Sequence, residues 1–236
     1  MNRGIFISFE GGEGAGKSTQ MALLERHLRS TGESAVALRE PGGTEIGEEI
    51  RKILKGNSYG SPPTAEVELL LFLASRAQLV RERILPALRA GHIVLCDRYG
   101  DSTVAYQCGG RGLGEEDVEL LHKFANGGAE PDLTVLLDIS PEEGFRRIRS
   151  RRNGLADRME KEPMEFFRRV RASYGRIAAK NPGRVRLVDA SLPENAVHDE
   201  ICSAVTDYVA ASRTAINRSS SGEASESVPH ADRAGR

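Results

Sequence analysis

The stretch FEGGEGAGKST, residues 9–19, places four glycines and one lysine within eleven residues, directly after the apolar run IFIS. It fits the spacing G-x-x-x-x-G-K-[ST], which begins at Gly11 and ends with Lys17 and Ser18. That spacing is informative only between a strand and a helix. The apolar run before it and the apolar periodicity after it meet this condition, with Met21, Leu24 and Leu28 on one helical face and Gly32 at the end.

The glycines have a physical purpose beside that lysine. They let the backbone turn so that successive N–H groups point inward, and the following helix adds its N-terminal partial positive charge. Lys17 then reaches the β- and γ-phosphates of a nucleotide, and the Ser18 hydroxyl is a ligand for Mg²⁺. The alternative is an ordinary glycine-rich turn before a helix. Taken with its context, the motif predicts a nucleotide-binding loop.

Short apolar runs rich in Val, Ile and Leu recur along the chain and alternate with helical patterns. They are nearly continuous in apolarity, as strands covered on both faces are. This alternation indicates βαβ units and predicts an α/β fold, a five-stranded parallel sheet with helices on both faces. The expected strands are residues 5–9, 35–38, 92–96, 133–138 and 185–189. The segment 64–80 is apolar almost all round, so we expect a buried helix there.

Composition limits the possible functions. The chain has 236 residues, 39% of them hydrophobic, and a net charge of −1, which argues against nucleic-acid or membrane partners. Three cysteines without close spacing argue against disulfides or zinc, and a cytoplasmic location is expected. Residues 213–236 are rich in Ser, Gly and charge, so we expect one domain over 1–212 and a disordered tail, the alternative being a loosely docked extension.

Polar residues follow the predicted strands where those strands end. Asp97 and Arg98 follow one strand and Arg39 follows another, and the carboxyl ends of parallel strands meet at one edge of the sheet. Arginine suits phosphate oxygens, and Asp97 suits a magnesium-bound water or the acceptor. A structural Asp–Arg pair and a surface arginine are the alternatives. Phe72 and Arg76 share a helical face. One interpretation is that the Phe72 ring stacks on a base and Arg76 hydrogen-bonds it. The alternative is that Phe72 is a core ring and Arg76 caps its edge.

The run RRIRSRR, residues 146–152, contains five arginines and is followed by NGLADRME. A run of like charge is usually a solvated face or a nucleic-acid patch. Here the glycine-containing continuation also indicates a short flap, whose arginines would close over a transferred phosphoryl group.

These motifs together resemble the thymidylate kinase family of P-loop nucleoside monophosphate kinases. The resemblance covers about residues 1–210 and rests on FEGGEGAGKST, LREPGGT, LLFLASRAQ, CDRYGDSTVAYQCGGRGL, PDLTVLLD and RIRSRRNGLADRME, in this order. It implies a P-loop NTPase fold with a short arginine-rich lid at about 146–160. It also implies transfer of the γ-phosphoryl group of ATP to dTMP with Mg²⁺, giving dTDP and ADP, by a homodimer.

The resemblance also implies a role for each residue. ATP would be bound by Gly11, Gly12, Glu13, Gly14, Ala15, Gly16, Lys17, Ser18 and Thr19. The substrate dTMP would be bound by Arg39, Phe72, Arg76, Arg98, Ser102, Thr103, Tyr106 and Gln107. The catalytic residues would be Lys17, Asp97, Arg98, Arg149, Arg151 and Arg152, and the metal site would involve Ser18 and Asp97.

Three points stay open in the sequence. Glu13 stands where some family members carry a cation. In this respect the sequence resembles the bacterial-type members, in which lid arginines supply that charge. The lid is about one residue longer than expected. Which of its arginines faces the phosphates is therefore undecided. The adenine pocket is expected near Ala190 and Ser191. Rival functions are another nucleoside monophosphate or deoxynucleoside kinase, although Arg39 argues against a neutral acceptor, and a non-catalytic nucleotide-dependent regulator.

Overall fold

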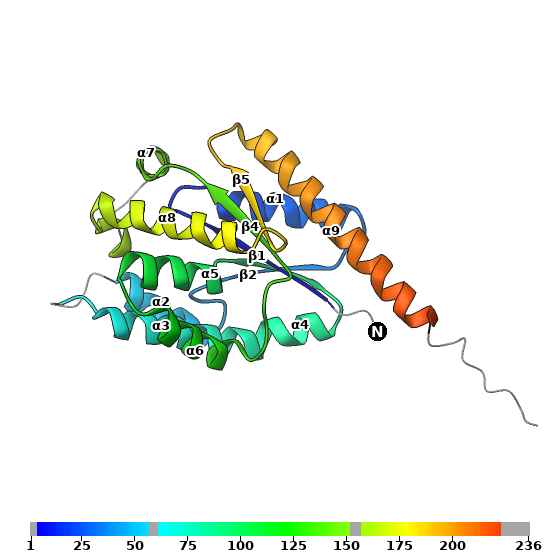
Figure 1. Cartoon of the computed structure of the whole chain (residues 1–236), viewed down its shortest axis with the longest axis horizontal. Helices are drawn as coiled ribbons and strands as arrows, with labels where there is room; N and C mark the ends of the chain where they lie inside the picture. Colours follow the sequence, from blue (N-terminus) through cyan, green and yellow to red (C-terminus); the bar gives the residue numbers. More distant parts are fainter. Residues whose placement is uncertain (1–3, 57–60, 152–156, 223–236) are drawn as a thin grey trace, which may run out of the picture.

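The computed structural model describes residues 4–56, 61–151 and 157–222, without the side chains of Arg151 and of residues 215–222. Over these residues the chain forms a five-stranded, all-parallel sheet in the order β2-β3-β1-β4-β5 (Figure 1). The strands are β1 (Ile5–Gly11), β2 (Ala35–Arg39), β3 (Ile93–Asp97), β4 (Leu133–Asp138) and β5 (Val185–Asp189). The predicted α/β fold is confirmed, and each strand lies within two residues of its expected bounds.

Two helices cover one face of the sheet. Helices α1 (Lys17–Ser30) and α9 (Glu194–Gly222) pack on each other and on the central strands (Figure 1). Alternate residues of β1, namely Ile5, Ile7 and Phe9, point into this layer and are buried with Leu24 and Leu28 of α1. The strand period of two therefore divides β1 between two cores, because Phe6 belongs to the cluster on the opposite face.

The opposite face is covered by η1 (Val80–Ile84), α4 (Leu85–Arg89), α5 (Gly100–Thr103), η2 (Val104–Gly110) and α8 (Met164–Lys180). Both η1 and η2 are π-helical turns, a form that is often found at functional sites. Helices α2 (Glu45–Lys55), α3 (Ala65–Leu79) and α6 (Glu115–Asn126) form an outer layer, in which α3 contacts both others. The remaining helices are α7 (Pro141–Arg151) and the 3₁₀ turn η3 (Met159–Lys161).

Helix α3 corrects one expectation, because it is not buried all round. Leu69 and Leu73 of α3 are buried against α6, but Val67 and Leu70 are 45% and 53% exposed. The helix begins after Thr64, whose hydroxyl oxygen caps its first turn, as that of Thr44 caps α2. The apolar surface of this helix therefore exceeds what the monomer covers.

The C-terminal helix also differs from expectation. Helix α9 continues through residue 213 and ends at Gly222, inside the segment for which a disordered tail is predicted. Arg213 forms an ion pair with Glu33 near the end of α1, which anchors this turn of the helix. The remaining part of the predicted tail, residues 223–236, lies outside the described residues. Over the described part of the chain, none of the helices combines the length and apolarity of a membrane span.

Candidate active site

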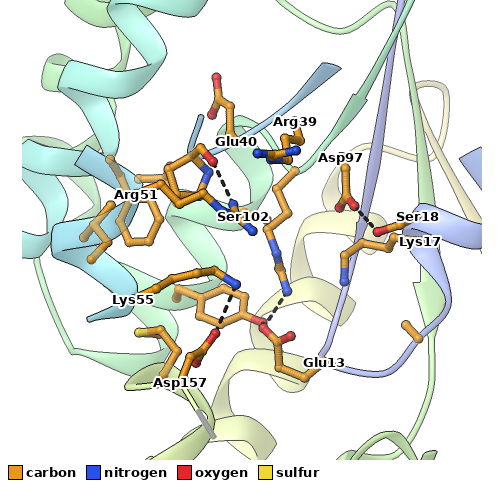
Figure 2. Close-up of a pocket in the computed structure, with 18 of the residues that line it drawn as sticks. Glu13, Lys17, Ser18, Arg39, Glu40, Arg51, Lys55, Asp97, Ser102 and Asp157 are labelled. Atoms are coloured by element: carbon orange, nitrogen blue, oxygen red, sulfur yellow. Dashed lines mark hydrogen bonds and ion pairs between the residues drawn. The ribbon is translucent and has the colours of Figure 1, made fainter. Parts of the chain in front are cut away.

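A cavity of about 350 Å³ opens at the carboxyl edge of the sheet (Figure 2). Strand register explains why side chains from distant segments meet there, because Asp97 at the end of β3 pairs with Phe9 of β1 and with Arg39 of β2. The predicted site residues that line the cavity are Glu13, Gly14, Ala15, Gly16, Lys17, Ser18, Thr19, Arg39, Phe72, Arg76, Asp97, Arg98, Ser102, Thr103, Tyr106 and Gln107. The structure thus gathers around one cavity motifs that the sequence separates by up to 94 residues.

Glycine is required at specific points of the phosphate loop. Gly11, Gly14 and Gly16 have φ angles of 131°, 71° and 91°, which side-chain-bearing residues rarely adopt. Gly14 also lies against the backbone of Gly144 in α7, and a Cβ atom on either glycine would collide with a carbonyl oxygen of the other segment. The loop is therefore packed directly against the first turn of the helix that carries the arginine run.

Lys17 is folded onto this loop. Its Nζ atom donates hydrogen bonds to the carbonyl oxygens of Gly11 and Gly12, at 3.0 and 2.8 Å. Burial, and then the nearby charge of Arg98, lower the pKa of Lys17 to about 8. At neutral pH its ammonium group is therefore charged, yet it is costly to keep charged without an anionic partner, as suits a phosphate-binding lysine.

Ser18 and Asp97 meet beside Lys17. The Ser18 hydroxyl donates to Oδ2 of Asp97 at 2.6 Å, so α1 and the end of β3 present a hydroxyl and a carboxylate at one point. Hard cations such as Mg²⁺ prefer oxygen ligands of this kind.

Arg98 crosses the floor of the cavity from a left-handed backbone position with φ of 72°. Its guanidinium donates to the Gly11 carbonyl at 3.2 Å and to Oε1 of Glu13 at 2.6 Å, and it lies 4.9 Å from the centre of the Tyr106 ring. Burial opposes ionisation of Glu13, but Arg98 and then Lys17 outweigh it and hold the pKa of this carboxyl at about 2. Tyr106 donates its hydroxyl proton to the same Oε1 at 3.0 Å.

Two further arginines face the cavity beside Arg98. Arg39 is about half exposed and donates to both carboxylate oxygens of Glu48 on α2, each at 2.8 Å. Arg51, also on α2, donates to the Pro41 carbonyl at 2.7 Å. Burial and the neighbouring Arg39 lower the pKa of Arg51. Arg39, Arg51 and Arg98 form an arginine cluster whose like charges favour binding of an anion.

The other end of the cavity is shaped by α3 and η2. Phe72 is only partly buried and lines the cavity, which favours the base-stacking interpretation over a core ring. Arg76 is 2% exposed and pairs with Glu40 at 2.7 Å. Gln107 donates to Glu68 of α3 at 3.1 Å, so η2 is tied to the helix that carries Phe72.

Beneath Arg98 lies a buried carboxyl group that sequence reasoning missed. Glu10 of β1 accepts hydrogen bonds from the Tyr99 N–H at 2.8 Å, the Ser102 hydroxyl at 2.5 Å and the Tyr174 hydroxyl at 3.0 Å. Burial, and then Asp101, raise the pKa of Glu10 from about 4.5 to about 7. This carboxyl group holds the backbone turn from which Arg98 projects.

Because the pKa of Glu10 is raised in the folded protein, we expect its ionisation to lower the free energy of unfolding as pH rises. The folded state binds the Glu10 proton more tightly than the unfolded chain, so the stabilisation is fully present below pH about 4.5 and is lost as pH rises through about 7. Glu10→Gln lacks this ionisable group. Between pH 4.5 and 7, the free energy of unfolding of the parent should therefore fall by about 3 kcal/mol relative to that of the variant. Urea unfolding of both proteins across this range measures it, and a difference independent of pH would contradict the raised pKa.

The predicted lid is only partly described. Arg149 is exposed on α7 and does not line the cavity, while Arg152 and the Arg151 side chain lie outside the described residues. The chain that follows the predicted lid is attached to α2 and α3. Asp157 pairs with Lys55 of α2 at 3.0 Å, and Arg158 pairs with Glu68 of α3 at 2.5 Å. Lys55, Asp157 and Glu13 all line the cavity and lie close together in Figure 2.

Arg147 marks the region where the adenine pocket is expected. From α7 it donates to the carbonyl oxygens of Ala190 and Ser191 after β5, at 2.8 and 3.4 Å. It was not singled out in the sequence because the arginine run hides which member points inward. Arg51 and Glu40 were missed as well; Glu40 had a usable signal, because it directly follows Arg39 at a strand end.

The profile of the family described as "Thymidylate kinase" matches residues 9–201. Among curated relatives, the thymidylate kinase of Thermomicrobium roseum is 50% identical over 86% of this chain and 95% of its own length. Those of Pelotomaculum thermopropionicum and Kosmotoga olearia are 47% and 45% identical, over 88% and 84% of this chain and 95% and 93% of their own lengths.

Proposed function

The chain belongs to the thymidylate kinase family, and from this premise we propose how its residues divide the transfer of a phosphoryl group from ATP to dTMP. The rival kinase and regulator functions are not favoured, because the relatives are thymidylate kinases over most of the chain. One observation carries the division of roles. The phosphate loop, the arginine cluster and the Phe72–Arg76 pair line a single cavity, so the groups proposed to bind the phosphates and the base converge on one space.

The proposed mechanism is positioning with charge neutralisation, since phosphoryl transfer leaves little covalent chemistry to the protein. Loop residues 11–19 bind the ATP phosphates, with Lys17 moving from its carbonyl partners to the phosphoryl group. Arg39, Arg51 and Arg98 hold the dTMP phosphate in line with the γ-phosphoryl group. An oxygen of the dTMP phosphate attacks the γ-phosphorus, the bond to the β-phosphate oxygen breaks, and dTDP and ADP result.

We further propose that Mg²⁺ accompanies ATP and is held near Ser18 and Asp97. The 2.6 Å contact between their oxygen atoms supports this assignment, and Mg²⁺ sites with few protein carboxylates are common where phosphates supply the other ligands. When bound, the ion neutralises charge on the phosphate oxygens. In the described ranges, no cluster of three or more His, Cys, Asp or Glu residues offers a metal site made by protein alone.

Tyr106 and Glu13 are assigned to the sugar. Their hydroxyl and carboxylate groups are joined at 3.0 Å, and Arg98 fixes the carboxylate from the other side. A 2′-hydroxyl beside this pair would have to displace it, which favours deoxyribose. Ser102, Thr103 and Gln107 complete this wall from α5 and η2.

The deciding experiment is a turnover panel. Release of ADP is followed with dTMP, dUMP, CMP, AMP and thymidine under identical conditions. Turnover highest with dTMP and absent with thymidine is expected, because a neutral nucleoside leaves the arginine cluster without an anion. Turnover highest with CMP or AMP, or with thymidine, would refute the assignment of the acceptor.

We expect Phe72→Ala to weaken dTMP binding by about 5- to 150-fold, the range for losing one aromatic–base stack, with ATP binding unchanged. The matched control is the next residue, because Leu73 is buried against α6 and faces away from the cavity. Leu73→Ala should lower the melting temperature and leave dTMP affinity in the folded fraction unchanged. Isothermal titration and thermal unfolding of both variants decide; the reverse pattern would make Phe72 a core ring.

We propose a homodimer through the outer layer of helices. Val67 and Leu70 of α3 lie next to α6, where Leu120 and Phe124 are 69% and 81% exposed, and such apolar faces commonly mark interfaces. Leu70→Glu with Phe124→Glu should yield monomers in sedimentation velocity. Leu187→Glu on β5, which also replaces an exposed leucine, should leave the dimer intact. A parent protein that sediments as a monomer would contradict the proposal.

Residues 1–212 are proposed as one kinase domain that includes the lid. The family match to residue 201 supports this boundary, although α9 runs beyond it. A cytoplasmic location is also proposed; Cys96, Cys108 and Cys202 are free thiols, as is usual in reducing compartments.

A further inference from the structure

The guanidinium of Arg76 is almost fully committed to the protein. Its Nε–H donates to Oε2 of Glu40 at 2.8 Å, and Nη2 lies 2.7 Å from the same oxygen. Both hydrogens of Nη1 are also used, one on the Thr103 hydroxyl at 2.9 Å and one on Nδ1 of His122 at 3.0 Å. Because arginine only donates, Nη2 alone keeps an N–H for a ligand in the cavity.

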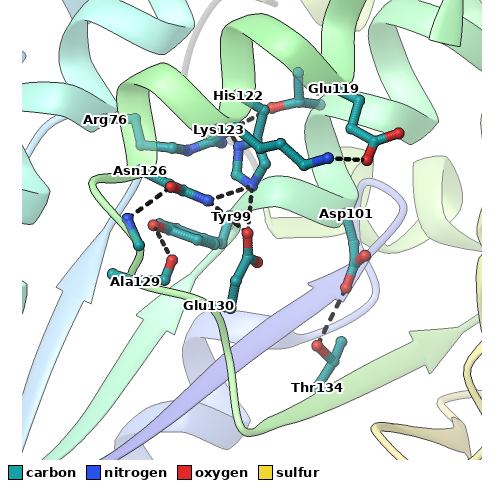
Figure 3. Close-up of polar contacts among 12 residues, drawn as sticks. Arg76, Tyr99, Asp101, Glu119, His122, Lys123, Asn126, Ala129, Glu130 and Thr134 are labelled. Atoms are coloured by element: carbon teal, nitrogen blue, oxygen red, sulfur yellow. Dashed lines mark hydrogen bonds and ion pairs between the residues drawn. The ribbon is translucent and has the colours of Figure 1, made fainter. Parts of the chain in front are cut away.

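His122 reaches Arg76 from outside the substrate cavity. It lies on α6 and lines a separate cavity of about 380 Å³, whereas Arg76 and the phosphate loop line the substrate cavity. Figure 3 shows His122 beside Arg76 and Asn126. Its ring packs edge-on against Tyr99 at 5.8 Å between centroids, and a Cβ atom at Gly100 would come within 2.9 Å of it. The ring is therefore fixed by packing before any polar contact is considered.

The hydrogen-bond network assigns the tautomer of this ring. Nδ1 must be unprotonated, because it accepts from Arg76. On the other side, the Gly128 N–H donates to Oδ1 of Asn126, which turns the Asn126 amide nitrogen toward Glu130 and the ring. The Nε2 proton of His122 then points to Oε1 of Glu130, 3.3 Å away. Oε1 of Glu130 accepts from both Nε2–H and the Asn126 amide N–H, so the 3.2 Å contact between these two nitrogens is not a hydrogen bond.

We propose that His122 is a positioning residue for base recognition, which holds Arg76 so that one Nη2 hydrogen remains for an acceptor on the pyrimidine. This inference rests on the proposed role of Arg76 at the base. The unprotonated Nδ1 of the neutral imidazole accepts one of the Nη1 hydrogens. That hydrogen is therefore not offered to the cavity. A fixed single donor matches a carbonyl on the base and opposes an exocyclic amino group, so the same contact serves selection of dTMP over dCMP.

The first test compares two replacements of His122. His122→Phe keeps a ring against Tyr99 but loses the acceptor, whereas His122→Asn retains an acceptor near the Nδ1 position. We expect His122→Phe to raise KM for dTMP about tenfold, as fits loss of one hydrogen bond to a charged group, with KM for ATP and kcat little changed. Its preference for dTMP over dCMP in kcat/KM should fall. His122→Asn should stay close to the parent.

Lys123→Ala is the matched control on the same helix, because Lys123 pairs with Glu119 on the exposed side of α6. It should change none of these constants. The inference is overturned if His122→Phe keeps the parental KM for dTMP, or if His122→Asn is as impaired as His122→Phe.

A second measurement needs no active variant. In the parent protein, 15N chemical shifts of labelled histidines should show an unprotonated Nδ1 and a protonated Nε2 for His122, with the signal assigned by its absence in His122→Asn. A protonated Nδ1 in the neutral ring would overturn the inference even if His122→Phe fails to fold. The parent's turnover with dTMP tests the proposed function separately, so failure of one can be told from failure of the other.

Discussion

Replacing Lys17 with alanine is expected to lower kcat by at least about 10²- to 10³-fold, the effect of removing one donor from a site of developing charge. The side chain is buried against the carbonyls of Gly11 and Gly12 and belongs to the cavity. Its removal should therefore leave the fold intact. Steady-state kinetics at saturating ATP and dTMP, with circular dichroism on the same sample, measures both effects.

The control for this prediction is Lys52→Ala, which removes a lysine paired with Glu49 on the exposed surface of α2. Near-parental kcat in a folded Lys17→Ala protein would refute the phosphate-loop assignment. Loss of folding in Lys17→Ala alone would instead show that the lysine stabilises the loop through its two carbonyl contacts.

Joint replacement of Arg149, Arg151 and Arg152 with alanine is expected to lower kcat by about 10³- to 10⁵-fold while dTMP still binds. The reason lies in the phosphate loop, where Glu13 is a carboxylate held ionised by Arg98 and Lys17, so that Lys17 is the loop's only cation. A second positive charge on the transferring phosphoryl group must then come from elsewhere. Single replacements should show one position with the largest drop, which would settle which arginine faces the phosphates.

Arg146→Ala serves as the control for the lid, because Arg146 is exposed and paired with Glu143 one turn earlier on the same helix. If the triple variant phosphorylates dTMP at close to the parental rate, the arginine run is a solvated face or a nucleic-acid patch. Titration of the triple variant with dTMP separates loss of binding from loss of turnover.

The fold was accessible from the sequence because its signals are local. A buried parallel strand is a short, continuous apolar run, and the side chains just beyond such runs, such as Arg39 and Asp97, had to meet at one edge of the sheet. Phe72 was harder, because helical spacing alone does not tell a ring that faces a ligand from one that faces the core. In the structure Phe72 is partly buried and lines the cavity, which favours the first interpretation, and Phe72→Ala tests it.

The missed features depend on tertiary placement. Arg51 lies in mid-helix, and only the packing of α2 on α3 turns it to the cavity. Glu10 reads as part of a strand until Tyr174, 164 residues away, supplies a hydroxyl. The π-helical turns at 80–84 and 104–110 directly continue α3 and α5, and they were not predicted from the sequence. The exposed face of α3 was missed because apolar content does not reveal whether this chain or another copy covers it.

The contact between Gly14 and Gly144 restricts how this enzyme can be re-engineered. The backbones of the phosphate loop and of α7 leave no room for even a methyl group between them. A chimaera that imports a foreign loop with a side chain at position 14 would displace α7 and, with it, the arginines carried further along the helix. Donor and recipient must therefore be matched at both glycines, so the unit of exchange is the loop together with α7.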